Sequence, residues 1–360
     1  IVRQEPDQNI FISPLSVSMA LGMTANGAAG ATLDSMRATL ELTGLTEEES
    51  NAAYQSLIAL LTQADPQVRM EIANSLWPRQ GWTFEEDFIQ RCEDYFAADI
   101  RSLDFADPAS VDVINAWIEE NTNGLIREML DTIPAEAVLY LINALYFKGT
   151  WTYEFDPAET VDDQFNLLDG SQVSIRMMRQ EADLLYLANE QFQAVDLPYG
   201  DGLFSMTVLL PQPGISVDSI ISELTPEYWS TWIGSLDTTA IHLQMPKFKL
   251  GYKVEMNDIL SNMGMAVAFS PAEADFTRMI PRARLGHANL FISRVLHQTF
   301  VQVDEEGTEA AAATIVEIGR VSMPATIAFR IDRPFIFVIR ERTSGAMLFM
   351  GKIVEPLWEE

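Results

Sequence analysis

The sequence contains one cysteine among 360 residues, which restricts its chemistry. A lone Cys92 excludes an internal disulfide, a redox pair and a cysteine-based metal cluster. Phe84, Phe88, Cys92 and Phe96 recur at helical spacing, so we expect the thiol to be buried and structural.

Histidine is also scarce, and no catalytic motif accompanies the three that occur, His242, His287 and His297. The sequence has no Gly-x-Ser-x-Gly elbow, His-Glu-x-x-His, phosphate loop or Gly-x-Gly-x-x-Gly. His242 alternates with apolar neighbours, which favours a structural role over that of a base. We therefore expect no enzymatic activity, no catalytic residue, no metal and no cofactor.

Basic residues number 23 against 52 acidic ones, giving a net charge of −29. Such a surface repels phosphate backbones and anionic membranes, so we expect neither nucleic acid nor a membrane as partner. An acidic surface that keeps the protein soluble is favoured over one that steers a basic partner protein, and an unusual high-salt habitat is a third explanation. The chain opens on Ile1 without an initiator Met, so its compartment cannot be inferred from the sequence.

Long apolar runs, linkers and repeats are missing as well, which favours a single domain over residues 1–360. Helix-start signals lie at Ser13-Pro14, Thr46 and Thr83, in a mainly helical first third, and a further helix is predicted over 107–123. Strand patterns dominate afterwards, and 252–263 has helical spacing. Helices first and strands later predict an α+β fold. The expected strands are 138–147, 172–178, 194–197, 203–210, 240–245, 300–304, 327–331, 334–340 and 346–353.

An alanine-rich segment near the end has two faces when alternate positions are compared. One face is small or apolar and uncharged, and the other carries two glutamates, Glu309 and Glu317. A strand with such a face can be buried, but four consecutive alanines have weak strand propensity and suit a helix or a loop equally well. The uncharged face comprises Thr308, Ala310, Ala312, Thr314, Val316 and Ile318.

Five motifs occur in order along nearly the whole chain, and together they resemble the serpins. They are residues 9–16 (NIFISPLS), 142–151 (INALYFKGTW), 303–311 (VDEEGTEAA), 332–337 (DRPFIF) and 349–353 (FMGKI). The resemblance implies three β-sheets, about nine helices and an exposed reactive loop over about 305–331. It also implies a suicide-substrate inhibitor of serine proteases, in which the cut loop inserts into the central sheet. The chain begins partway through what would be the family's first helix, and we expect this truncation to lower stability rather than activity.

The resemblance also suggests residue roles. Ser13, Ser16, Asn143 and His297 match a hydrogen-bonded cluster that governs opening of the central sheet, and Trp151 matches the top of that sheet, where insertion begins. The matching hinge comprises Glu305, Gly307, Thr308, Glu309, Ala310, Ala311, Ala312 and Ala313.

The family's usual spacing from Glu305 places the reactive bond at Val321-Ser322, and Arg320-Val321 is the alternative. Valine before the cut suits an elastase-like protease, and arginine suits a trypsin- or subtilisin-like one. Different proteases could use both bonds.

The uncharged face of the hinge favours an inhibitor over a non-inhibitory binding, carrier or chaperone protein on the same fold. The helix over 46–63 has no basic residue, so we expect no glycosaminoglycan activation. We expect a monomer, metastable in its intact form, and the family favours an extracellular or cell-envelope location.

Overall fold

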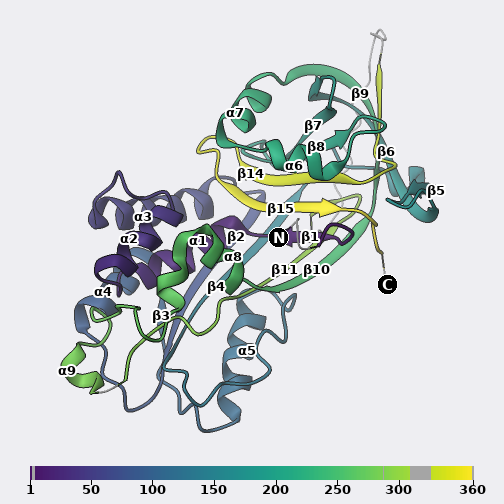
Figure 1. The fold of residues 1–360 in the computed structure, drawn as a ribbon. Helices are drawn as coiled ribbons and strands as arrows, with labels where there is room; N and C mark the ends of the chain where they lie inside the picture. The colour runs from purple at the N-terminus through teal and green to yellow at the C-terminus, as the bar shows by residue number, and fades with distance from the viewer. Residues whose placement is uncertain (2–4, 287, 309–325, 359–360) are drawn as a thin grey trace.

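The computed structural model describes residues 1, 5–286, 288–308 and 326–358 (Figure 1). Helices and strands are both abundant in it, and the predicted α+β class is confirmed. No helix in the described ranges is long and apolar enough to cross a membrane. The α-helices are α1 Pro14–Ala25, α2 Gly30–Thr39, α3 Glu47–Gln63, α4 Glu86–Phe96, α5 Ala109–Asn121, α6 Val217–Glu223, α7 Pro226–Gly234, α8 Asn257–Leu260 and α9 Arg282–Leu285.

The strands form two hydrogen-bonded networks within the described chain. They are β1 Ile10–Ile12, β2 Val68–Pro78, β3 Asp99–Ile100, β4 Leu139–Thr150, β5 Val161–Asn166, β6 Gln172–Ala188, β7 Phe192–Tyr199, β8 Phe204–Pro211, β9 Asp237–Pro246, β10 Phe248–Glu255, β11 Leu296–Val303, β12 Gly307–Thr308, β13 Ile327–Arg330, β14 Phe335–Glu341 and β15 Met347–Ile353.

The nine-stranded sheet has the order β1-β15-β14-β8-β7-β6-β9-β13, with β5 also paired to β6. Its longest strand, β6, has 17 residues and is shared between two parts of the sheet. The middle of β6 pairs with β9, whereas its last residues, from Leu185 to Ala188, pair with β7. One network can therefore hold two of the three sheets that the resemblance implies. β13, parallel to β9, forms the edge of this sheet and follows the predicted reactive loop in the sequence.

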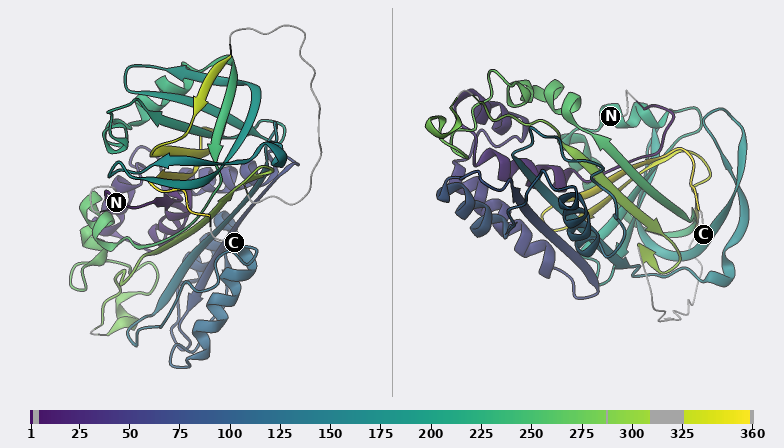
Figure 2. Two further views of the ribbon diagram at one scale, coloured as in Figure 1. Left: turned by 90° about the vertical axis from the view of Figure 1, so that its right-hand side faces the viewer. Right: turned by 90° about the horizontal axis from the view of Figure 1, so that it is seen from below.

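The six-stranded sheet, of order β10-β11-β12-β4-β2-β3, has helices on both faces (Figures 1 and 2). On one face α5 packs through Trp117, which meets Trp77 of β2 edge-on at 6.0 Å. On the opposite face α1 buries Leu15 and Met19. Aromatic and aliphatic side chains buried on both faces supply the main free energy that holds this sheet between its helices.

The expected helix starts at Ser13 and Thr46 are confirmed. Ser13 caps α1 by accepting a hydrogen bond from the Ser16 backbone, and Thr46 and Glu49 form a capping box at α3. The start at Thr83 is wrong, because α4 begins at Glu86 and Glu85 holds the cap position without a side-chain hydrogen bond. Cys92 is buried in α4 as expected, and burial raises the pKa of its thiol to about 12.

Five observed strands, β1, β2, β3, β5 and β10, were not predicted from the sequence, and the two longest of them occupy segments expected to be helical. β2 runs through the supposedly helical first third, and β10 occupies the first part of the segment predicted as a helix from residue 252. Both strands owe their conformation to distant partners, since β2 pairs with β4 and β10 pairs with β11.

Candidate functional site

The predicted hinge begins as a short strand inside the six-stranded sheet. Thr308 of β12 lies across from Gly149 of β4 on one side and Val303 of β11 on the other, antiparallel to both. β4 and β11 therefore run parallel to each other on either side of β12. Of the described residues in the predicted reactive loop, Gly307 and Thr308 thus already occupy a central position in this sheet.

A tight turn brings β12 back against β11. The Asp304 carboxylate accepts hydrogen bonds from the backbone N–H groups of Glu306 and Gly307, at 3.1 and 3.3 Å. The Asp304 N–H donates to the Gly307 carbonyl at 3.0 Å, which closes the turn. Aspartate favours such turns because its side chain can satisfy the backbone two residues further on.

Glycine is required at position 307 because there is no room for a side chain, and not because of its backbone dihedral angles. A Cβ placed on Gly307 would lie 2.1 Å from the Gly149 carbonyl oxygen, far inside van der Waals contact. The close approach of these two backbones allows β12 to sit between its neighbours.

Glu305 anchors the hinge through its side chain. One carboxylate oxygen lies 2.6 Å from Lys247 Nζ, and the other accepts the Thr160 hydroxyl at 2.8 Å. The Glu305 carbonyl also accepts the Phe155 N–H at 2.9 Å. Burial raises the pKa of Glu305, but hydrogen bonds from Lys247 and Thr160 outweigh it, so the pKa lies below its usual value.

Trp151 holds the other side of the turn. Its indole N–H donates to the Asp304 carbonyl and its backbone N–H donates to the Glu306 carbonyl, both at 2.9 Å. The ring stacks on Tyr199 with centroids 4.4 Å apart, and the Tyr199 hydroxyl lies 2.5 Å from the Thr308 hydroxyl. We call Trp151, Tyr199, Lys247, Glu305 and Thr308 the hinge cluster.

A cavity of about 170 Å³ lies along the six-stranded sheet, several residues beyond the β12 pairing. Only Gly149 and Thr150 of the twelve β4 residues pair with β12. The lower part of β4, from Leu139 to Leu145, lines the cavity together with Leu296 to Thr299 of β11, and α1 and α5 contribute further residues. The cavity is therefore bounded on two sides by the strands β4 and β11, which are not hydrogen-bonded to each other within the described chain.

Ser13, Ser16 and His297 lie together in the lining of this cavity. The Ser13 N–H donates to His297 Nε2 at 2.9 Å, and the Ser13 hydroxyl donates to the Leu348 carbonyl and accepts from the Ser16 N–H. All three residues are buried. Burial lowers the pKa of His297 to about 4, so the ring is neutral and can accept this hydrogen bond at pH 7.

Asn143 joins this cluster from β4. Its side-chain N–H donates to the Asn74 amide oxygen at 2.9 Å, and its backbone carbonyl accepts the Ser16 hydroxyl at 3.4 Å. Its buried Oδ1 has no hydrogen-bond partner among the described residues. A buried acceptor without a donor costs free energy, so this oxygen favours any state that supplies one.

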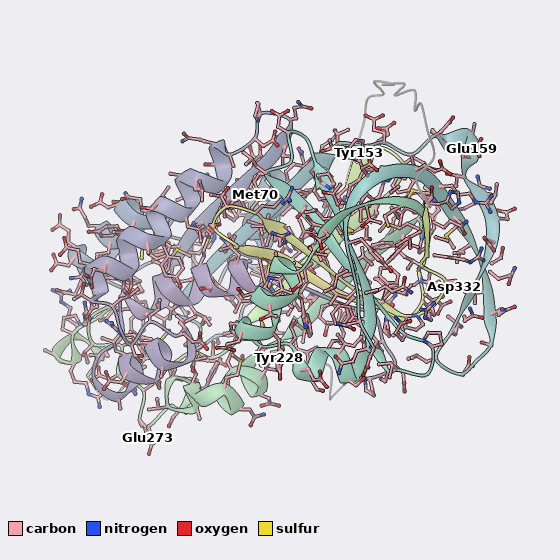
Figure 3. The ribbon with its side chains drawn as sticks, turned by 90° about the horizontal axis from the view of Figure 1, so that it is seen from above. Met70, Tyr153, Glu159, Tyr228, Glu273 and Asp332 are labelled. Carbon is pink, nitrogen blue, oxygen red and sulfur yellow. The ribbon has the colours of Figure 1, made fainter. Side chains whose placement is uncertain are left out.

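The remaining predicted site residues lie outside the described ranges. They are Glu309, Ala310, Ala311, Ala312, Ala313, Arg320, Val321 and Ser322. In the view of Figure 3, Tyr153, Glu159 and Asp332 lie in the same half of the molecule, opposite Glu273.

The sequence analysis missed three residues of the site, Lys247, Thr160 and Tyr199. Of the three, Lys247 could most readily have been found from the sequence. It follows Pro246 and interrupts an apolar strand pattern with a charge that needs a partner. His242 is half-exposed and bonded to Glu181 and Gln244, which fits the structural role expected for it.

Comparison with known proteins defines the class. The profile of the family described as "Serpin (serine protease inhibitor)" matches residues 1–356, and the chain belongs to this family. Human serpin B9 is 34% identical over 99% of this chain and 95% of its own length. Rat neuroserpin is 32% identical over 97% of this chain and 87% of its own.

Solved structures confirm the serpin fold. The native state of tengpin, a thermophilic serpin, has a TM-score of 0.88 at 34% identity, covering 97% of this chain and 89% of that one. Tengpin in its latent state gives 0.84. Thyroxine-binding globulin in complex with thyroxine gives 0.88 at 26% identity, covering 99% of this chain and 95% of that one.

Proposed function

We propose that the protein inhibits serine proteases as a suicide substrate. The protease's serine hydroxyl attacks the carbonyl of the reactive bond, the peptide bond breaks, and the new amine leaves with the C-terminal part of the loop. The N-terminal part stays esterified to the protease and inserts between β4 and β11 before water can hydrolyse the ester. The protein supplies the strand and not the catalytic groups, so it acts as an inhibitor and not as an enzyme.

The observation that carries this proposal is the position of β12. Thr308 already pairs with β4 and β11, and the same two strands line the cavity further along the sheet. A cut loop can extend this pairing one residue at a time without first opening the sheet. The exposed edges of β4 and β11 offer the hydrogen bonds that a central antiparallel strand needs.

Continuation of the register supports the same proposal. Six residues beyond Thr308 lies Thr314, and six residues before Gly149 and Val303 lie Asn143 and His297. We therefore expect insertion to bring the Thr314 hydroxyl to the Asn143 side chain, whose Oδ1 lacks a donor. Insertion would then supply a hydrogen bond that the intact protein lacks.

The energetics favour insertion once the loop is free. Each new backbone hydrogen bond contributes about 1 kcal/mol, so roughly a dozen inserted residues would contribute on the order of 10 kcal/mol. One buried unpaired charge would cost several kcal/mol and could stop the process. The face from Thr308 to Ile318 carries no charge, which removes this obstacle.

The target class follows from the reactive bond. Cleavage at Val321-Ser322 would suit an elastase-like protease, and cleavage at Arg320-Val321 a trypsin- or subtilisin-like one. We propose that the protein is a monomer. We also propose that it needs no polyanion for activity, because α3, from Glu47 to Gln63, contains no basic residue.

Incubation with pancreatic elastase, trypsin and subtilisin tests the proposal. With at least one protease we expect a covalent complex that survives boiling in detergent and appears as a band on a gel. We also expect a released C-terminal fragment whose mass shows that its first residue is Val321 or Ser322. Clean cleavage by all three without such a band would reject inhibition of these classes. A cut before Ile318 would reject both bonds.

A non-inhibitory binding protein is the second candidate. The cavity between β4 and β11 and the similarity to thyroxine-binding globulin favour it. The thermal midpoint after loop cleavage separates the two, because insertion converts a kinetically trapped intact form into a more stable one. A midpoint that rises strongly on cleavage supports the inhibitor, and an unchanged midpoint supports the binding protein.

A further inference from the structure

The C-terminal tail is bound along the edge of the six-stranded sheet. After β15, the backbone N–H groups of Val354 and Glu355 donate to the Asn9 amide oxygen at 2.8 and 3.1 Å, and the Asn9 amide donates to the Glu355 carbonyl at 2.7 Å. Two residues later, the Leu357 carbonyl accepts the Lys249 N–H at 2.7 Å. These four hydrogen bonds fix the tail beside β10.

The tail places Trp358 over two lysines. Lys247 Nζ lies 4.4 Å from the centroid of the Trp358 ring, and Lys249 Nζ lies 4.6 Å from it. Lys247 and Lys249 are two positions apart in an extended segment, so their side chains point to the same face and can share one ring. Both distances are within the range of a cation–π interaction, for which tryptophan is the strongest aromatic partner.

One of these lysines is the partner of the hinge. The same Lys247 ammonium that contacts the Trp358 ring lies 2.6 Å from Glu305 Oε2. A lysine side chain has several rotatable bonds and adopts one geometry only where its surroundings hold it. Trp358 and Glu305 therefore both contact the same ammonium group.

We propose that Trp358 is a positioning residue for the hinge: through Lys247 it holds Glu305, and with it the turn from Asp304 to Gly307, in place until the reactive loop is cut. This inference deepens the proposed inhibitory function and rests on it for its biological meaning. The contact itself can be tested without any protease.

Hydrogen exchange of the protein with its reactive loop uncut is the measurement. The backbone N–H groups of Trp151 and Phe155 donate to the Glu306 and Glu305 carbonyls, so they report directly on the hinge. In Trp358→Ala we expect both amides to exchange about three- to tenfold faster, and in Trp358→Phe we expect most of the protection to remain. Leu357→Ala, which alters an exposed side chain of the same tail, should leave exchange unchanged.

A double-mutant cycle shows whether Trp358 acts through Lys247. In a Lys247→Met background, Trp358→Ala should accelerate exchange no further, whereas in a Lys249→Met background its effect should persist. Unchanged exchange in Trp358→Ala would overturn the proposal, and so would an effect of equal size with and without Lys247. Because these readouts involve no protease, they can succeed or fail independently of the inhibition assay.

Discussion

Lys247 and Glu305 meet at 2.6 Å where the chain turns into the six-stranded sheet, and the rest of the hinge cluster is arranged around this pair. Glu305 is buried and Lys247 is largely so. Desolvation offsets much of the attraction within such a pair, but removal of one partner leaves the other charge buried and uncompensated. The pair therefore makes the hinge sensitive to single substitutions.

Lys247→Met tests this sensitivity. We expect the variant to lose about 2 kcal/mol of stability and to expose the hinge, because only Thr160 would then satisfy the Glu305 carboxylate. Thermal or urea midpoints measure the loss. Lys253→Met is the matched control, since its 3.8 Å pair with the exposed Asp131 should contribute less than about 0.5 kcal/mol. Equal effects of the two substitutions would refute a special role for Lys247.

Gly307→Ala tests whether β12 must approach β4 so closely. The added Cβ would meet the Gly149 carbonyl oxygen at 2.1 Å, so we expect a loss of about 1–3 kcal/mol and slower complex formation with the protease. Gly251→Ala adds the same methyl group in β10 with its nearest neighbour at 3.9 Å and should be well tolerated. Normal complex formation by Gly307→Ala would show that β12 is not needed for insertion.

Thr308→Arg tests the inward face. Thr308 is already buried against Tyr199 in the intact protein, so an arginine there must either be desolvated or draw the start of the loop out of the sheet, at a cost of several kcal/mol. We expect at least a tenfold loss of covalent complex in favour of cleaved protein. Ala310→Pro should act alike by removing a backbone donor. Glu309→Arg, on the opposite face by alternation, should retain inhibition, and if it fails as Thr308→Arg does, the assignment of faces is wrong.

Acid should weaken the native state through His297. Its pKa of about 4 lies below the usual 6.5, so the unfolded chain binds a proton between these values and the native protein does not. Stability is then complete above pH 6.5 and falls as the pH drops toward 4, by about 1.4 kcal/mol at pH 5.5 relative to pH 7.5. Unfolding midpoints at these two pH values measure the difference, and His297→Gln should lack most of it. An equal pH dependence in both proteins would assign the effect to other groups.

Local signals in the sequence were sufficient to predict several helix starts and one buried strand face. The caps at Ser13 and Thr46 need only neighbouring residues, so both were predictable, and the alternation that starts at Thr308 agrees with its burial. β10 was not predictable, because Tyr252 and the residues after it also fit a helical spacing, and only pairing with β11 decides between the two.

The site depends still more on distant contacts. Ser13 and His297 could be assigned together only through the family resemblance, since no local pattern connects them. Nothing in the sequence indicates that Lys247 faces Glu305 or that Trp358 reaches Lys247, because long flexible side chains are placed by the packing of strands that are far apart in the chain.

The decisive measurement is hydrogen exchange of β4 before and after the reactive loop is cut. The amides of Leu139 to Leu145 that point away from β2 face the cavity in the intact protein. If the cut loop becomes a central strand, these amides should exchange at least about a hundredfold more slowly in the cleaved protein and in its covalent complex. Exchange at the same rate in intact and cleaved protein would contradict loop insertion between β4 and β11.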